Sequence, residues 1–365
     1  PDNYVIDRRT GETLEVSLSG GASVNGASVT QADIEAVNGV IHIIDAVLLP
    51  PEPTITEVAA ATDDLSTLVT ALTTAELDDD LAGDGPFTVF APVNSAFDAL
   101  GADVVAALLQ EGNRQLLTDI LGYHVVPGAA VQSGDLTDGQ TVTTLQGEEL
   151  TIGVSDGDVT VNGANVITAD VEAANGVVHL VDGVLLPEVD IVEQAILTPA
   201  TQTLVAAIIA GDLVETLKGD GPFTVFAPDD AAFEALEDYT LAQLLDPANQ
   251  ELLQKVLTYH VVPGDIRAAD LVDGATVTTV QGQELTIDLS SGQNPMVNDA
   301  DITATDIVVS NGVIHLIDGV LLPELDIVET AVLTATTATR VDAVAAAELV
   351  ETLQGEGPFP AIAAP

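Results

Sequence analysis

The chain has 365 residues, and 58 acidic residues against 7 basic ones give a formal charge of −51 at neutral pH. This balance excludes nucleic acids and anionic membrane surfaces as partners, because they attract clustered lysine and arginine. Hydrophobic residues reach 47% and charged residues only 18%, which predicts folded domains rather than disorder. Cysteine is absent, which excludes disulfides and thiol chemistry, and no apolar run reaches the ~18 residues of a membrane span.

The sequence repeats itself every 136 or 137 residues, a period that corresponds to a whole domain. Three motifs carry the repeat: Gly-Pro-Phe at 85–87, 221–223 and 357–359, Tyr-His-Val-Val-Pro-Gly at 123–128 and 259–264, and Asn-Gly-Val-Ile/Val-His at 38–42, 175–179 and 311–315. We therefore predict the C-terminal half of a domain in residues 1–50 and complete domains in 54–187 and 188–323. Residues 324–365 form the N-terminal part of a further domain. We expect that end to be frayed or differently folded, because Pro360 cannot donate to a central strand.

Within one copy, apolar residues first recur at helical spacing, as in Ile191, Ala195 and Leu204. Asn94, or Asp230 at the matching position of the next copy, precedes the following periodic run and is predicted to be an N-cap. A second helical region over 241–257 leads to the Tyr-His motif.

After the Tyr-His motif the period becomes two, which predicts strands at 276–280, 284–288 and 312–317. Gln281-Gly282 supplies the hairpin turn between the first two strands, as Gln146-Gly147 does one copy earlier. Helices followed by antiparallel strands predict an α+β domain.

The seven phenylalanines all fall in the segment that begins with Gly-Pro-Phe, and we interpret them as core anchors. They are Phe87, Phe90, Phe97, Phe223, Phe226, Phe233 and Phe359.

Together, the segments Gly-Pro-Phe-Thr-Val-Phe-Ala-Pro, Tyr-His-Val-Val-Pro-Gly and Asn-Gly-Val-Ile/Val-His-Leu-Ile/Val-Asp-Gly-Val-Leu-Leu-Pro resemble the fasciclin domain. The resemblance covers both complete copies and, as fragments, both ends. It implies tandem domains, each a wedge or sandwich of β-strands with helices packed around it, in secreted or cell-surface adhesion and matrix proteins.

The resemblance also implies adhesive contacts at two places in each complete copy. One is the Tyr-His segment, and the other is the Asp-Ile type of segment before the last strand, which animal members of the family use for integrin binding. The candidate residues are Tyr123, His124, Asp170, Val171, Tyr259, His260, Asp306 and Ile307, with Asp33-Ile34 in the first partial copy. The alternative is structural: a histidine whose hydrogen bonds link helix to strand, and an exposed Asp beside a buried Ile or Val at a turn.

Catalytic and metal motifs are weak in this sequence. The string at 153–157 matches the Gly-x-Ser-x-Gly pattern around Ser155, but it joins two predicted strands, so we expect a plain turn. The run at 78–80 has three aspartates but lacks the spacing of a calcium loop, and we interpret it as a solvated helix end. We predict no enzyme and no cofactor, with at most weak, diffuse calcium or sodium binding at the acidic surface. An enzyme would need groups present in only one copy, such as Ser155, Arg114, Lys255 or Arg267.

The function that we expect is non-catalytic adhesion outside the cell, with other proteins or cell-surface polysaccharide as partners. The alternative is a surface filament or sheath in which the incomplete terminal domains associate head to tail. Such a joint domain would lack about 42 residues, so trimmed ends are the simpler explanation. The acidic, lysine-poor surface predicts a marine or halophilic setting, because salt screens its self-repulsion.

Overall fold

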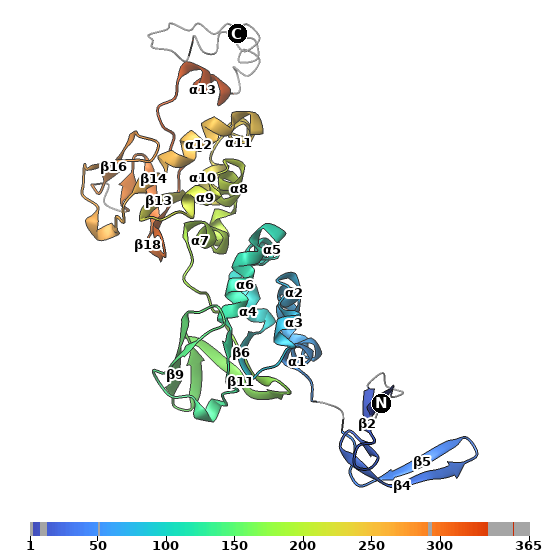
Figure 1. Ribbon diagram of the computed structural model, residues 1–365. Helices are drawn as coiled ribbons and strands as arrows, with labels where there is room; N and C mark the ends of the chain where they lie inside the picture. The colour runs from blue at the N-terminus through green and yellow to red at the C-terminus, as the bar shows by residue number, and fades with distance from the viewer. Residues whose placement is uncertain (1–2, 8–12, 50–51, 291–293, 335–352, 354–365) are drawn as a thin grey trace.

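The computed structural model describes residues 3–7, 13–49, 52–290, 294–334 and 353. A five-stranded sheet comes first, and two units follow that each combine a seven-stranded sheet with helices (Figure 1). The first helix of a further copy, α13 (Ile327–Val332), follows the second unit. The irregularity predicted around Pro360 lies outside the described residues.

The N-terminal sheet is antiparallel, with its strands in chain order. Its strands are β1 (Asn3–Asp7), β2 (Thr13–Ser17), β3 (Ser23–Val24), β4 (Ala27–Ala36) and β5 (Gly39–Ile44). Among the described strands, β5 pairs only with β4. Val40 and Ile41 are therefore 55% and 54% exposed, whereas Val177 and Val178, their counterparts in the first complete unit, are 0% and 1% exposed.

The two complete units repeat the same order of helices and strands. The first has α1 (Ile55–Ala61), α2 (Ser66–Thr74), α3 (Asp78–Leu81), β6 (Phe87–Pro92), α4 (Asn94–Leu100), α5 (Ala102–Leu108), α6 (Arg114–Tyr123), β7 (Val125–Pro127), β8 (Thr141–Thr143), β9 (Glu149–Ser155), β10 (Asp158–Val161), β11 (Ala164–Ala173) and β12 (Gly176–Val181). The second has α7 (Ile191–Leu197), α8 (Gln202–Ala210), α9 (Val214–Leu217), β13 (Phe223–Pro228), α10 (Asp230–Glu234), α11 (Asp238–Leu244), α12 (Gln250–Tyr259), β14 (Val261–Pro263), β15 (Thr276–Thr278), β16 (Glu284–Asp288), β17 (Met296–Val297), β18 (Ala300–Val309) and β19 (Gly312–Ile317).

Each seven-stranded sheet is mixed. The order in the first unit is β7-β6-β12-β11-β10-β9-β8, and β14-β13-β19-β18-β17-β16-β15 repeats it in the second. The last strand of each unit pairs in parallel with its Gly-Pro-Phe strand, β12 with β6 and β19 with β13, and the other pairs are antiparallel. The predicted α+β class is confirmed, and so are the turns at Gly147 and Gly282, whose φ values are 111° and 104°.

Alternation along the strands gives each sheet its own core. In β9, Leu150 and Ile152 are fully buried while Glu149 and Thr151 are exposed, as a period of two requires. The apolar residues of the first sheet gather around Phe90, and those of the second around Phe226. Phe90 and Phe226 are 1% and 0% exposed, which confirms them as core anchors.

The first helix of each copy begins with a capping box. Thr54, Asp190 and Asp326 each accept a hydrogen bond from the backbone N–H of a glutamate three residues later, and that glutamate bonds back. The predicted N-caps at Asn94 and Asp230 are wrong. Their side chains instead accept from the N–H groups of Thr67 and Thr203, at 2.9 and 2.7 Å, at the start of α2 and α8. Each residue therefore satisfies the free N–H groups of a neighbouring helix rather than its own.

Successive copies meet through their helices. α7 lies against α5 of the preceding unit (Figure 1). One continuous apolar cluster includes helix residues of both units. At the next junction, the Thr240 hydroxyl in α11 donates to the Leu333 carbonyl after α13 at 3.0 Å, and Lys255 in α12 contacts Glu329 in α13 at 2.7 Å. The first helix of each following copy thus packs on the helices of the copy before it.

Candidate functional site

The histidine of each Tyr-His segment is buried at the end of a helix. Nδ1 of His124 lies 2.7 Å from the Ile120 carbonyl, and Nε2 accepts the N–H of Leu185 at 2.9 Å. His260 repeats both bonds one unit later, at 2.8 and 2.9 Å. Because Nε2 accepts, Nδ1 carries the proton and the ring is neutral. Burial lowers the pKa of both imidazoles to about 4.

These bonds tie the end of α6 to the segment that follows β12, and the end of α12 to the segment that follows β19. They confirm the structural interpretation of His124 and His260 as links within the fold. The neighbouring tyrosine is bound in the same way: the hydroxyl of Tyr123 donates to the Glu149 carbonyl at 3.0 Å and accepts from the Asn162 amide at 2.7 Å. Both members of the segment are 5% exposed or less in each unit.

The histidine of the last strand makes a second link. In His179, Nδ1 accepts the Asp170 N–H at 3.2 Å, Nε2 lies 2.9 Å from the Val131 carbonyl, and the ring stacks on Phe90 with 5.6 Å between centroids. His315 repeats the arrangement in the second unit. His42 also accepts an N–H, from Asp33, but its ring is exposed in the N-terminal sheet.

Each Asp-Ile type segment lies at a bulge in the long strand before the last one. The aspartates at 33, 170 and 306 have φ of 59°, 60° and 59°, where the pairing register of that strand shifts. Asp170 accepts from both the N–H and the hydroxyl of Ser133, at 2.6 and 2.5 Å, and these bonds lower the pKa of its carboxyl below the usual range. The side chain remains 36% exposed. Val171 and Ile307 pack partly buried against the core.

The eight candidate residues therefore form two separate places in each unit rather than one site. The Asp-Ile type segment lies beside the histidine of the last strand, as the bond between Asp170 and His179 shows. Tyr123 and His124 bond instead to α6, to β9 and β10, and to the segment after β12. Of these eight residues, Asp170 and Asp306 are the two that present a carboxylate near the surface.

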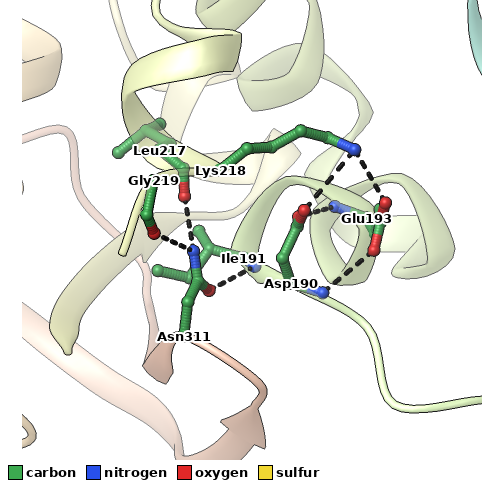
Figure 2. A network of polar contacts seen from close by, with 7 residues as sticks. All are labelled: Asp190, Ile191, Glu193, Leu217, Lys218, Gly219 and Asn311. Atoms are coloured by element: carbon green, nitrogen blue, oxygen red, sulfur yellow. Dashed lines mark hydrogen bonds and ion pairs between the residues drawn. The ribbon is translucent and has the colours of Figure 1, made fainter. Parts of the chain in front are cut away.

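A cleft in the second complete unit was missed by the sequence reasoning. On one side, the ammonium of Lys218 lies 2.7 Å from a Glu193 oxygen and 3.4 Å from an Asp190 oxygen, and these carboxylates also form the capping box of α7 (Figure 2). Although partial burial works to lower the pKa of Lys218, the two carboxylates raise it above the ordinary value. Asn311 fixes this wall, because its side chain accepts the Ile191 N–H and donates to the carbonyls of 217 and 219.

The other wall carries the second cation of the cleft. Nε and Nη2 of Arg267 contact the two oxygens of Asp265, at 2.5 and 2.6 Å. This bond raises the pKa of Arg267 and lowers that of Asp265. The cleft has a volume of about 680 Å³, within the range of small-molecule sites.

Both cations of this cleft, and the carboxylates of Asp190 and Asp265, belong to the second unit alone. The first unit keeps the scaffold, since Asn175 makes the same three bonds as Asn311. Its residues at the positions of Asp190, Lys218, Asp265 and Arg267 are Thr54, Ala82, Ala130 and Gln132. The sequence signal that could have located the cleft is this difference between the two copies. It singled out Arg267 but not Lys218.

The other chemical motifs take ordinary positions. Ser155 ends β9, and the turn to β10 passes through Asp156 and Gly157 with φ of 53° and 95°, so the predicted plain turn is confirmed. Asp78–Leu81 form the short helix α3. Among the residues that the structure describes, no group of three histidine or carboxylate side chains could hold a metal ion. Within the same residues no single helix could cross a membrane, and one pair, Ile191–Leu197 with Pro199–Ala210, has the length and composition only across a 109° bend.

The repeats are similar to a domain of known proteins. The profile of the fasciclin domain matches residues 2–50, 63–187 and 199–323. Transforming growth factor-beta-induced protein ig-h3 of Sus scrofa is 36% identical over 255 residues, which are 69% of this chain and 37% of that protein. Human periostin is 33% identical over 297 residues, 79% of this chain and 34% of that protein. The chain therefore spans well under half the length of these two relatives.

A shorter relative matches a single stretch. Protein sll1483 of Synechocystis is 53% identical over 138 residues, 37% of this chain and 73% of that protein. Among solved structures, a fasciclin-domain pair from the insect cell adhesion molecule fasciclin I aligns with a TM-score of 0.36 and 21% identity, over 72% of this chain and 97% of that one.

Proposed function

The chain belongs to the fasciclin domain family, and on this premise we propose that it is a non-catalytic adhesion or matrix protein that acts outside the cell or at its surface. One observation carries the proposal: the buried histidines, which are the residues best suited to acid-base chemistry near neutral pH, are bonded into the fold, and the cavity beside His124 has a volume of only about 20 Å³. The tandem units then serve to present surface contacts, and the partners are other proteins or polysaccharide.

The exposed carboxylates of Asp170 and Asp306 are the part of the two adhesive segments best placed to reach a partner. We expect Asp170→Asn with Asp306→Asn to weaken the attachment of chain-coated beads to cells or matrix, while unfolding stays nearly unchanged because an amide oxygen still accepts the N–H of Ser133 or Ala268. Equal attachment of the variant and the parent chain would remove these residues from the proposal. If the parent chain attaches to no cell, matrix or glycan surface and does not self-associate, the adhesive function itself fails.

A head-to-tail filament is the second candidate, and the open edge of β5 favours it. In both complete units the corresponding strand pairs in parallel with a Gly-Pro-Phe strand, and this pairing buries its apolar residues. In the filament, the incomplete domain at residues 324–365 of another molecule supplies the partner of β5. Electron microscopy at high protein concentration should then show filaments that are lost in Ile41→Lys. Monomers alone would exclude this arrangement.

The acidic surface supports a salt-rich setting, marine or halophilic. With a formal charge of −51, the folded chain repels itself, and salt screens this repulsion. We expect the melting temperature to rise with added sodium chloride and with calcium. A melting temperature that does not respond to either salt would contradict the proposed setting without affecting the fold.

A further inference from the structure

The fold does not require the two cations in the cleft of the second complete unit, because the first unit builds the same scaffold with alanine and glutamine at their positions. Four basic residues lie in the described part of the chain, and two of them, Lys218 and Arg267, line this cleft. In a chain with so few cations, two at one concave place indicate a site.

The cleft is held in shape before any ligand arrives. The capping box fixes the carboxylates of Asp190 and Glu193, and these fix Lys218 (Figure 2). Asp265 holds Arg267 by two contacts. A preorganised site of this kind loses little conformational entropy on binding.

Donors remain available on both cations. An ammonium has three N–H donors and a guanidinium has five, and the contacts above use two of each. Both side chains are about one third exposed, at 34% for Lys218 and 33% for Arg267. The paired carboxylates, which accept hydrogen bonds, line the same cleft, so it offers donors and acceptors together.

The charges decide which ligand fits. A free anion is repelled, since four carboxylates, including Asp220, line the cleft with the two cations. A free cation finds the carboxylates of Asp190, Glu193 and Asp265 already paired with the ammonium and the guanidinium. A hydroxyl group carries no charge, accepts from a cation and donates to a carboxylate, and neighbouring hydroxyls of a sugar ring do both at once. Pro222 and Val309 add apolar surface for the C–H face of a ring.

We propose that this cleft binds a neutral polysaccharide through its hydroxyl groups. The inference rests on the proposed adhesive function for its role, and it specifies one partner class and one of the two units. The first unit, with alanine and glutamine at the positions of the two cations, does not share the site.

The test uses the whole chain with cellobiose and maltotetraose as neutral probes and tri-galacturonate as an acidic probe. In NMR spectra, the neutral probes at millimolar concentration should shift the amides of 218–221 and 310–312. Lys218→Ala with Arg267→Gln, which installs the residues of the first unit, should weaken this binding about tenfold or more. Arg114→Gln removes a cation that pairs with Glu76 in the first unit and is the matched control, expected to bind like the parent chain.

Three results would overturn the proposal: no shift with either neutral probe, unchanged binding in the double variant, or tighter binding of tri-galacturonate than of the neutral probes. Thermal unfolding of the double variant confirms that it is folded. Bead attachment measured in parallel separates the two claims. Saccharide binding without attachment would contradict the adhesive function but keep the site, whereas attachment without saccharide binding would contradict the site alone.

Discussion

The two complete units differ in charge at positions where their backbones agree. Asn175 and Asn311 bond to equivalent groups, and the first helix of each unit has a capping box with a glutamate, Glu57 or Glu193. In the first unit that glutamate faces Ala82, whereas in the second it bonds Lys218. The comparison separates what the fold needs, which both units keep, from what one unit has added.

The two junctions between copies also differ in charge at equivalent positions. At the second junction, Lys255 pairs with the capping glutamate Glu329 of the following helix at 2.7 Å. The position of Lys255 is held by Asp119 at the first junction. Partial burial raises the pKa of Asp119, and the nearby Glu193 raises it further. The two lysines of the chain thus both neutralise capping glutamates, one within its own unit and one across a junction.

The largest effect on stability should come from the phenylalanine that each unit buries in the core of its sheet. We expect Phe90→Ala and Phe226→Ala each to destabilise their own unit by about 3–5 kcal/mol, because both rings are fully buried and their loss leaves a cavity. Hydrogen exchange measured at increasing denaturant concentration gives the free energy of unfolding of each unit separately, and thus the loss caused by each variant. Phe87→Ala is the control and should cost less, since that ring is partly buried. A clear inequality between the two units would show that their scaffolds are not equivalent.

His124 and His260 should make both units sensitive to acid. Their pKa is about 4 in the folded chain and 6.5 in an unfolded one, so the unfolded chain binds the proton more tightly. Their contribution is complete above pH 6.5 and is lost as the pH falls to about 4, by about 3 kcal/mol for each imidazole. NMR titration should show neutral rings down to that pH.

Carboxylates also titrate in this range, so the contribution of the histidines has to be measured against a variant that lacks them. The pH dependence of unfolding in His124→Gln with His260→Gln supplies it. Parent and variant curves that stay parallel from pH 7 to 4 would contradict the assignment. Imidazoles that protonate near pH 6.5 in the folded chain would contradict it as well.

The sequence predicted those features that depend on local pattern or on the repeat. The turn at Gln281-Gly282 and the role of Phe226 follow from a period of two and from motif position. Three features depend on contacts between distant segments. Asn94 caps a helix that begins 28 residues before it, as its bond to Ser66 shows, and β6 finds its parallel partner β12 only after most of the unit. Lys218 and Arg267 reach one cleft through different loops, which no spacing rule indicates.

The charge difference between the two junctions can be reversed by exchanging Asp119 and Lys255. Lys255→Asp removes the pair with Glu329, whose two side chains are 27% and 17% exposed, and should weaken the docking of α13 by about 1 kcal/mol. Asp119→Lys removes a repulsion with Glu193 and should strengthen the first junction by a similar or smaller amount. Hydrogen exchange of α13 and α7 is the measurement. The double variant should show both changes independently, because the two positions lie in different units.

The smallest effect concerns stability at the cleft itself. Lys218→Ala should change the stability of its unit by no more than about 0.5–1 kcal/mol, because the ammonium is one third exposed and the capping box persists without it. The reciprocal variant, Ala82→Lys with Thr54→Asp, rebuilds the ion pair with Glu57 in the first unit. It should stabilise that unit by a similarly small amount. Urea unfolding of both variants measures these changes. A loss of several kcal/mol in Lys218→Ala would mean that the second unit depends on the lysine to fold, and the charge of the cleft would then be explained by stability rather than by a ligand.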